Sequence, residues 1–242
     1  MSDEGGARIG AVPDRSPIGR AFLTDDPDAG HLVLVRHGQQ QFPPPGTRDF
    51  SAFVDPPLSP TGRRQAEAVA RLFADQPVDA VYSSRLERAY DTGVAIASGH
   101  GLATTIVDDL REIEMFRDLP AGCSPREEFG TVALEAAREA FVATRRWDSY
   151  PATETGDQLR ARVGAALEPI LAAHPGQVVV VACHGGVINA YLAQVLGLTD
   201  EDMFFRPAHA SVHRVVYHGS KRVVRSLNEL HHLTPAHELV TY

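Results

Sequence analysis

The sequence predicts an α/β protein built as a three-layer sandwich, with a mostly parallel sheet, helices on both faces and an antiparallel edge strand. Three observations predict this fold class. Short apolar runs alternate with amphipathic segments of helical period, 43% of the 242 residues are hydrophobic, and the last two apolar runs follow each other with no helix between them. Strands that alternate with helices form parallel sheets through right-handed crossovers, and a pair of successive strands adds an antiparallel edge.

The first expected strand begins at His31 and contains the apolar run LVLV, which indicates burial on both faces of a sheet. The other expected strands are 79–83, 104–107, 177–183, 211–217 and 222–227. Ser59-Pro60 opens a helix whose apolar residues recur at helical spacing as far as Phe73. Further helices are expected at 86–97, 124–145, 157–173 and 187–196. The helix at 124–145 breaks the strict alternation, so we expect it to form part of a cap over the strand ends.

Residues 1–29 are expected to be a flexible N-terminal tail, because they are rich in Gly, Asp, Pro and Arg and show no periodicity. Residues 30–242 are expected to form a single domain, since one α/β domain commonly reaches this length.

The charge of the chain excludes several classes of partner. With 23 Lys and Arg against 31 Asp and Glu the net charge is −8, so we expect no nucleic-acid and no membrane partner, both of which require clustered positive charge. Cys123 and Cys183 are too few for a disulfide scaffold, and no stretch approaches 18 apolar residues. We therefore expect a cytoplasmic protein.

Four polar clusters stand at expected strand ends or helix starts, where ligands bind in open α/β sheets. They are Arg36-His37-Gly38, Ser83 to Arg88, Leu110-Arg111-Glu112 and His184-Gly185-Gly186. Two His, two Arg and a carboxylate suit phosphoryl transfer, because guanidinium groups bind phosphate oxygens bidentately and imidazole can attack phosphorus. Glu112 is the candidate acid, with Glu114 and Asp109 as competitors.

Five ordered motifs resemble the histidine phosphatase superfamily, the phosphoglycerate mutase-like proteins. They are LVLVRHG, LSPTGRRQAEAVA, VYSSRLERAYDT, LRE and VVVACHGGVINAYLAQVLGL, spanning roughly His31 to Leu198. The resemblance implies that His37 is the nucleophile, that Arg36, Arg88 and His184 bind phosphate, and that Glu112 is the acid and base. It also matches Glu154-Thr155, ahead of Arg162, to the family's Gly-Glu-Ser segment, with Thr153 in place of Gly.

The substrate-binding candidates are Gly38, Gln39, Arg85 and Gly185. Departures from the family pattern favour hydrolysis over mutase activity. Gln39-Gln40-Gln41 replaces a segment in which mutases place an Asn, and the stretch between Glu112 and His184 is shorter than in true mutases. We therefore expect a phosphatase acting on a small phosphomonoester through a phosphohistidine.

Two alternatives to the phosphatase remain. The first is phosphoglycerate mutase-type phosphoryl transfer, since Arg145-Arg146-Trp147 resembles the Arg pair with which mutases bind a substrate carboxylate. The second is a non-catalytic phospho-ligand-binding protein, which need not keep both His and Glu. No cofactor is expected, and no metal site, so the remaining His residues are interpreted as surface residues: His100, His209, His213, His231 and His232. The sequence leaves a homodimer open.

Overall fold

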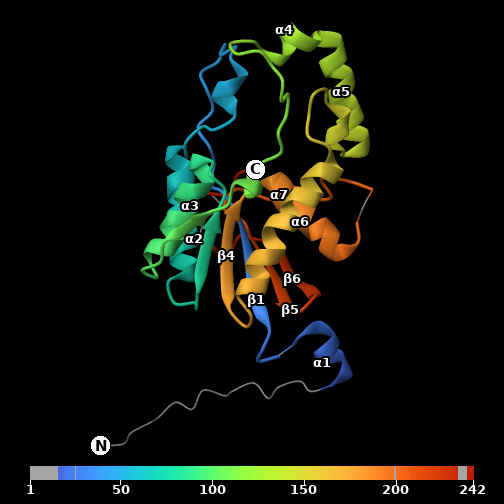
Figure 1. Cartoon of the computed structure of the whole chain (residues 1–242). Coiled ribbons are helices and arrows are strands. Elements are labelled where there is room, and N and C mark those ends of the chain that lie inside the picture. The colour runs from blue at the N-terminus through green and yellow to red at the C-terminus, as the bar shows by residue number, and fades with distance from the viewer. Residues whose placement is uncertain (1–15, 25, 199, 234–238) are drawn as a thin grey trace, which may run out of the picture.

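A computed structural model describes residues 16–24, 26–198, 200–233 and 239–242, and within them a six-stranded sheet has the order β3-β2-β4-β1-β5-β6 (Figure 1). The strands are β1 Gly30–Arg36, β2 Ala80–Ser83, β3 Thr104–Ile106, β4 Val178–Cys183, β5 Val212–His218 and β6 Lys221–Glu229. Strands β3, β2, β4 and β1 pair in parallel, whereas β5 is antiparallel to both β1 and β6. The predicted sheet and its antiparallel edge are confirmed.

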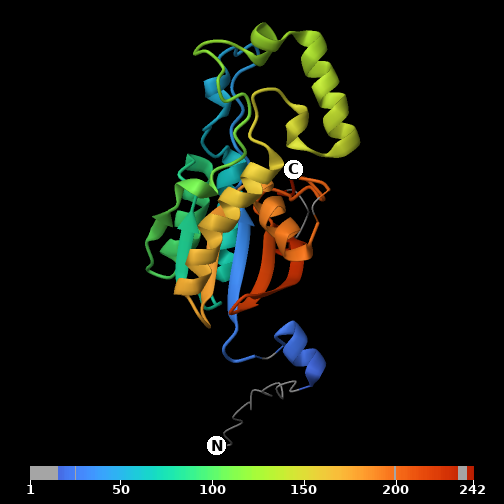
Figure 2. The same cartoon turned by 45° about the vertical axis from the view of Figure 1, so that its right-hand side comes forward.

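Helices cover both faces of the sheet, as the apolar runs predict (Figures 1 and 2). The helices are α1 Pro17–Phe22, α2 Pro60–Phe73, α3 Glu87–Ser98, α4 Pro125–Phe129, α5 Thr131–Thr144, α6 Gly156–Ala173 and α7 Gly185–Leu196. In β1, Leu32 and Leu34 pack in the core that contains residues of α6 and α7, while Val33 and Val35 pack in the core that contains residues of α2 and α3. Alternate side chains of a strand point to opposite faces, so the LVLV run serves both cores.

The helix predicted over 124–145 is wrong as a single element. It is two helices, α4 and α5, separated by Gly130, whose φ of 79° and ψ of 155° are incompatible with a right-handed helix. An isolated Gly inside a helical pattern does not by itself predict a break. Both helices lie beyond the carboxyl ends of the parallel strands, where the prediction placed a cap (Figure 2).

We define the cap as residues 42–57 and 115–153. These two segments meet at the hydrogen bond from the Phe50 N–H to the Cys123 carbonyl (3.3 Å) and at the Arg48–Glu127 ion pair. The cap therefore lies over the carboxyl ends of the parallel strands. The space between the cap and these strand ends is the candidate site.

Part of the predicted N-terminal tail is helical, and the flexibility expected of residues 1–29 stays a prediction. Residues 1–15 lie outside the described residues, but residues 17–22 form α1, which is capped by the Ser16 hydroxyl. Leu23 is buried in a small cluster with Ala29 and Val216. A capped helix and a buried leucine thus occur in a segment that has no periodic pattern. The domain boundary at residue 30 stays a prediction.

Candidate active site

Two histidines lie side by side at the carboxyl edge of the sheet. Strands β1 and β4 pair in parallel with Arg36 opposite Cys183, so the residues that follow them, His37 and His184, emerge next to each other. Their ring centroids are 5.1 Å apart, with the planes tilted by 57°. Both side chains are buried, which places two imidazoles at the floor of the space beneath the cap.

Hydrogen bonds fix the tautomer of His37. Its Nδ1 lies 2.6 Å from the Gly38 carbonyl oxygen, which only accepts, so Nδ1 carries the proton and Nε2 carries the lone pair. Arg88 Nε donates to that Nε2 across 3.3 Å. Burial, together with the nearby Arg88 guanidinium, holds the pKa of His37 well below its usual value. His37 therefore presents an unprotonated nitrogen to the guanidinium that is expected to bind phosphate.

Two buried guanidinium groups flank this nitrogen. Arg88 is 5% exposed and its Nη1 donates to the Val54 carbonyl (3.0 Å). Arg36 Nη1 donates to the Pro207 carbonyl (2.5 Å), while its Nε is buried without a partner in the described part of the chain. Burial lowers the pKa of Arg36 to about 10, against the opposing effect of the Glu112 carboxylate. Positive charge concentrated in a buried site favours an anion with several oxygens.

His184 is oriented by a hydroxyl from the neighbouring strand end. Its Nε2 lies 2.7 Å from Ser84 Oγ, and its Nδ1 is buried with no hydrogen-bond partner among the described residues. Burial, with Arg88 second, holds the pKa of His184 well below its usual value. When the serine hydroxyl donates to Nε2, Nδ1 carries the proton and can donate to a phosphate oxygen.

Glu112 lies where the chain after β3 meets the start of α7. Its Oε1 accepts from the N–H groups of Gly186 and Ile113, each at 3.0 Å. A Cβ at Gly186 would stand 2.5 Å from that oxygen, so the second Gly of His-Gly-Gly allows the carboxylate to reach the helix N-terminus. These two N–H groups hold Oε1 and so orient the carboxyl group at the N-terminus of α7.

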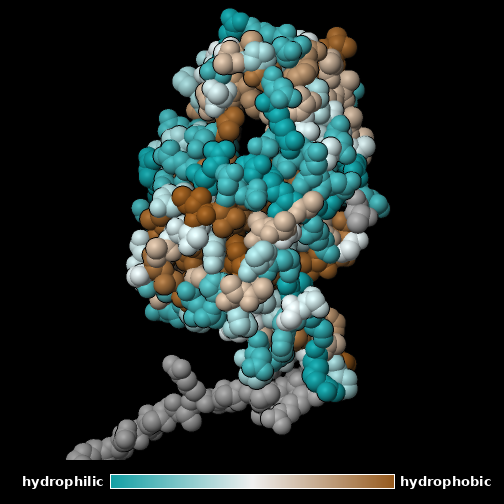
Figure 3. All heavy atoms as spheres, viewed as in Figure 1, coloured by the Kyte–Doolittle hydropathy of each residue, from teal (hydrophilic) through white to brown (hydrophobic). Residues whose placement is uncertain are grey.

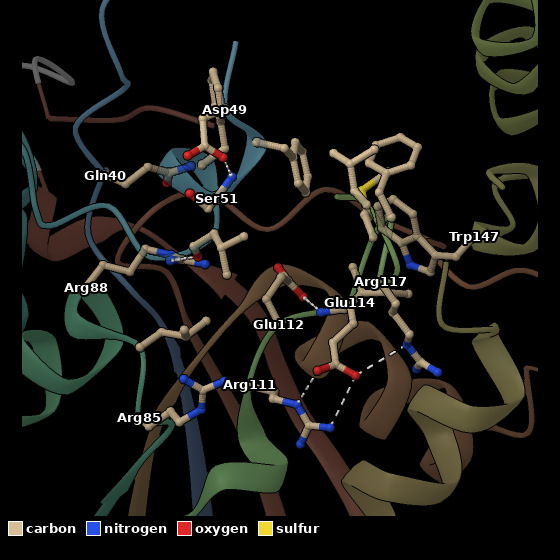
Figure 4. Close-up of a pocket in the computed structure, with 18 of the residues that line it drawn as sticks. Gln40, Asp49, Ser51, Arg85, Arg88, Arg111, Glu112, Glu114, Arg117 and Trp147 are labelled. Atoms are coloured by element: carbon tan, nitrogen blue, oxygen red, sulfur yellow. Dashed lines mark hydrogen bonds and ion pairs between the residues drawn. The ribbon is translucent and has the colours of Figure 1, made fainter. Parts of the chain in front are cut away.

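A cavity of about 610 Å³ lies beneath the cap, and Figure 4 shows Arg88 and Glu112 in its wall. Its inner part is lined by Arg36, His37, Arg88 and Glu112, while His184 packs against His37. In the space-filling view a hollow opens between the two segments of the cap (Figure 3). The structure thus brings together all five residues predicted to be catalytic. Their catalytic roles remain predictions.

Of the four substrate-binding candidates, the structure brings only Arg85 to the cavity lining, where its guanidinium is paired with Asp108. Gln39 accepts from the Ser59 hydroxyl (2.9 Å) and is not part of the lining; Gln40 lines the cavity instead. Neither Gly38 nor Gly185 lines it. A Cβ at Gly38 would stand 2.4 Å from the Gly62 carbonyl oxygen, so this glycine permits close packing of two chain segments.

Two histidines expected at the surface are buried, and one of them lies in the site. His209 is 2% exposed and His213 is fully buried. The His209 ring lies 5.6 Å from the His37 ring, and burial lowers the pKa of His209 to about 3. The residues before an antiparallel strand lie at the carboxyl edge of its parallel neighbours. His209 precedes β5, so this topology was the signal available in the sequence.

Glu154 and Arg162 fix the loop that carries Glu112. Glu154 is 2% exposed and accepts from Arg162 Nε (2.9 Å) and Nη2 (2.6 Å). Arg162 Nη1 donates to the carbonyls of Asp109 (2.7 Å) and Arg111 (3.0 Å). The segment matched to Gly-Glu-Ser therefore contacts the loop that carries Glu112 but does not line the cavity.

The residues that the structure describes contain no group of three or more His, Cys, Asp or Glu side chains placed to hold a metal ion. None of their helices combines the length and the hydropathy needed to cross a membrane.

Comparisons with known proteins agree with this geometry. The family model described as histidine phosphatase superfamily (branch 1) matches residues 32–230. A putative phosphoserine phosphatase 2 of Hydrogenobacter thermophilus is 30% identical over 208 residues, which cover 83% of this chain and 96% of that protein. The phosphoglycerate mutase-like protein 4 of Arabidopsis thaliana is 34% identical over 178 residues, covering 70% and 72%. The solved structure of a mycobacterial glucosyl-3-phosphoglycerate phosphatase superposes with a TM-score of 0.68 at 26% identity, covering 83% and 99%.

Proposed function

Because this chain belongs to the histidine phosphatase superfamily and is a phosphatase, we propose that it hydrolyses a small-molecule phosphomonoester through a phosphohistidine on His37. One observation carries the proposal: His37 Nε2, the nitrogen without a proton, lies 3.3 Å from Arg88 Nε. A nucleophile and a phosphate-binding group at that separation allow an oxygen of the phosphoryl group to contact the arginine while phosphorus faces the imidazole.

In the first step His37 Nε2 attacks phosphorus in line with the ester oxygen. The N–P bond forms as the P–O bond to the leaving alcohol breaks. Arg36, Arg88 and His184 donate to the three phosphoryl oxygens, whose charge the buried site stabilises more strongly than water does. Glu112, in its protonated form, gives its proton to the departing alkoxide.

In the second step water attacks the phosphohistidine. Glu112, now a carboxylate, takes a proton from the water as the O–P bond forms, and the N–P bond breaks to release inorganic phosphate. His37 returns to the neutral tautomer that the Gly38 carbonyl selects, and Glu112 returns to its protonated form. The proton balance closes without any group beyond these residues and water.

The arginine pair that suggested a mutase does not reach the cavity. Arg145 is paired with Glu201 and Arg146 with Asp148, and neither arginine is part of the lining, whereas Trp147 is. A substrate carboxylate therefore finds no arginine pair at this position, and hydrolysis is favoured over transfer to a second hydroxyl. Retention of both His37 and Glu112 in one site also favours catalysis over passive binding of a phosphorylated ligand.

The test is phosphate release from a panel of phosphomonoesters by the wild type and His37→Ala, with folding of both checked by circular dichroism. The proposal expects release by the wild type and loss of at least about 10³-fold in the variant, as for removal of a nucleophile. Isomerisation of 3-phosphoglycerate without phosphate release would favour the mutase, and unchanged turnover in His37→Ala would refute the mechanism. Phosphate binding without release from any ester would favour the non-catalytic alternative.

The proposal also includes the cellular compartment in which the protein acts. Cys123 and Cys183 are both free thiols, which agrees with a reducing compartment and supports a cytoplasmic protein whose partner is a small phosphorylated substrate. A homodimer stays a prediction.

A further inference from the structure

The outer part of the cavity, formed by the cap, is lined mainly by apolar side chains. Phe50 and Phe53 come from the 3-10 turn Phe50–Phe53, Phe116 from the chain after Glu112, and Trp147 from the 3-10 turn Trp147–Ser149. Phe53 is 41% exposed and Val54, also in the lining, is 48% exposed. Apolar surface left open inside a cavity of this size is a binding surface for an apolar ligand group.

Phe116 connects this lining into one aromatic cluster. Its ring packs edge-on against Phe50 (centroids 5.2 Å apart) and Tyr150 (6.2 Å) and stacks with Phe129 (5.7 Å). Its φ is 53°, a left-handed conformation that a bulky residue keeps only where its surroundings hold it. The aromatic wall is therefore fixed in place before a ligand binds, which lowers the entropy cost of binding.

The arginines around this wall are already neutralised. Arg85 is paired with Asp108, Arg111 with Glu114 (3.0 Å) and Asp109 (2.9 Å), and Arg117 with Glu114 (3.4 Å). Figure 4 shows Glu114 between Arg111 and Arg117, with Glu112 close by. A ligand carboxylate entering the outer cavity would meet paired cations and the carboxylates Glu114 and Asp49, so it would be repelled or would have to break an ion pair.

Two polar atoms of the lining are buried without a hydrogen-bond partner in the described part of the chain. They are the Gln40 Oε1 acceptor and the Trp147 Nε1 donor. Gln40 lies on the Arg88 side of the pocket and Trp147 lies across from it (Figure 4). Both atoms are neutral, so these two unsatisfied positions of the wall offer no charge that would attract a ligand carboxylate.

We propose that, given the phosphatase activity proposed above, the substrate is a phosphomonoester of a bulky alcohol that carries an aromatic ring and no carboxylate, with the ring bound against Phe53, Phe116 and Trp147. This substrate class differs from phosphoserine and glucosyl-3-phosphoglycerate, which appear in the names of the similar proteins. Arg36 and Arg88 bind the phosphate, and the cap selects the leaving group.

The test compares alkyl phosphates, so that the intrinsic reactivity of the leaving group is similar throughout. Steady-state phosphate release is measured for 2-naphthylmethyl phosphate, benzyl phosphate, phosphoserine and 3-phosphoglycerate. We expect kcat/KM for naphthylmethyl phosphate to exceed that for phosphoserine by about 100-fold, the upper range of discrimination by an apolar pocket. Phosphoserine or 3-phosphoglycerate as the best substrate would overturn the assignment and leave the phosphatase intact. No release from any ester would refute the phosphatase itself.

Variants locate the selectivity in the cap. Phe53→Ala is expected to lower the ratio of kcat/KM for naphthylmethyl phosphate to that for phosphoserine by about tenfold. Glu114→Gln removes the carboxylate that Arg111 and Arg117 share and leaves them Asp108, Asp109 and Glu154 as partners, so it should lower the same ratio by raising the phosphoserine value. Val132→Ala, an 82% exposed site on α5 outside the lining, is the control and should leave the ratio unchanged. A ratio that neither Phe53→Ala nor Glu114→Gln changes would overturn the proposal.

Binding can be observed apart from turnover, because Trp147 is the single tryptophan of the chain. Naphthylmethylphosphonate, which cannot be hydrolysed, should change Trp147 fluorescence saturably in the wild type and with at least about tenfold weaker affinity in Phe53→Ala. Inorganic phosphate, used as the control ligand, should bind both proteins alike. Equal naphthylmethylphosphonate affinity in the two proteins would contradict a ring site at Phe53.

Discussion

Acidification from pH 7.5 to 5.5 should destabilise this protein strongly, because its fold buries four neutral imidazoles. They are His37, His184, His209 and His213, and burial is the main cause of the lowered pKa of each. In the unfolded chain each imidazole has a pKa of about 6.5. Below that pH the unfolded chain binds protons that the native protein does not, so the free energy of unfolding falls as the pH falls.

The size of the effect follows from the number of groups. For His209 and His213 the folded pKa is about 3, so neither is protonated in the native state at pH 5.5. Each group then removes about 1.4 kcal/mol from the free energy of unfolding between pH 7.5 and 5.5. His209 and His213 together then remove about 3 kcal/mol, a large part of the stability of a typical domain, and the lowered pKa values of His37 and His184 act in the same direction.

A substitution at His213 tests this pH dependence at a single residue. Its Nδ1 accepts from the Asn228 N–H (3.1 Å) and its Nε2 lies 3.0 Å from Ser211 Oγ, so the neutral form is built into the fold. Urea unfolding is followed by circular dichroism in phosphate-free buffers at pH 7.5, 6.5 and 5.5. In His213→Gln the decrease in the free energy of unfolding between pH 7.5 and 5.5 should be smaller by about 1.4 kcal/mol than in the wild type. A wild type whose stability is flat over this range, or a variant with the same fall, would refute the reasoning.

Three other substitutions test the site and its support. Glu112→Gln should slow phosphoenzyme formation from alkyl phosphates by about 10²- to 10⁴-fold. The loss should be much smaller for p-nitrophenyl phosphate, because nitrophenolate leaves without a proton. Equal losses for the two kinds of substrate in single-turnover experiments would exclude Glu112 as the acid. Arg88→Lys should lower kcat/KM by about 10²-fold, because lysine lacks the planar fork, and an unchanged value would remove Arg88 from the phosphate site. Gly62→Ala places a Cβ 2.0 Å from the Gln39 carbonyl oxygen and should cost about 1–3 kcal/mol in urea unfolding, and an unaltered midpoint would contradict that packing.

The site residues at the strand ends were predictable because polar residues follow directly after continuous apolar runs. A continuous apolar run such as Leu32 to Val35 is buried on both faces, and the polar residues that follow it must lie at the edge of the sheet. Parallel pairing of β1 and β4 then brings His37 and His184 together, although they are far apart in sequence. The same logic placed Arg88 and Glu112 at that edge.

The cap and the third histidine were not predictable in the same way. The break at Gly130 depends on one positive φ, and the positions of Phe53 and Phe116 depend on loops with no repeating pattern. The spacing of His209 to His213 alone predicts a surface residue, whereas its place before an antiparallel strand puts it at the carboxyl edge of the sheet. Gln39 was expected to face the substrate, but its carboxamide pairs with Ser59. Contacts between loops distant in sequence decide these positions.

Rapid chemical quench with ³²P-labelled benzyl phosphate tests the catalytic role of His37 most directly. Within the first turnover, the wild type should carry acid-labile, base-stable phosphate, and peptide mapping should place it on His37, with no label in His37→Ala. Label on another residue, or product formed by the wild type at full rate with no labelled protein at any time, would contradict the phosphohistidine mechanism.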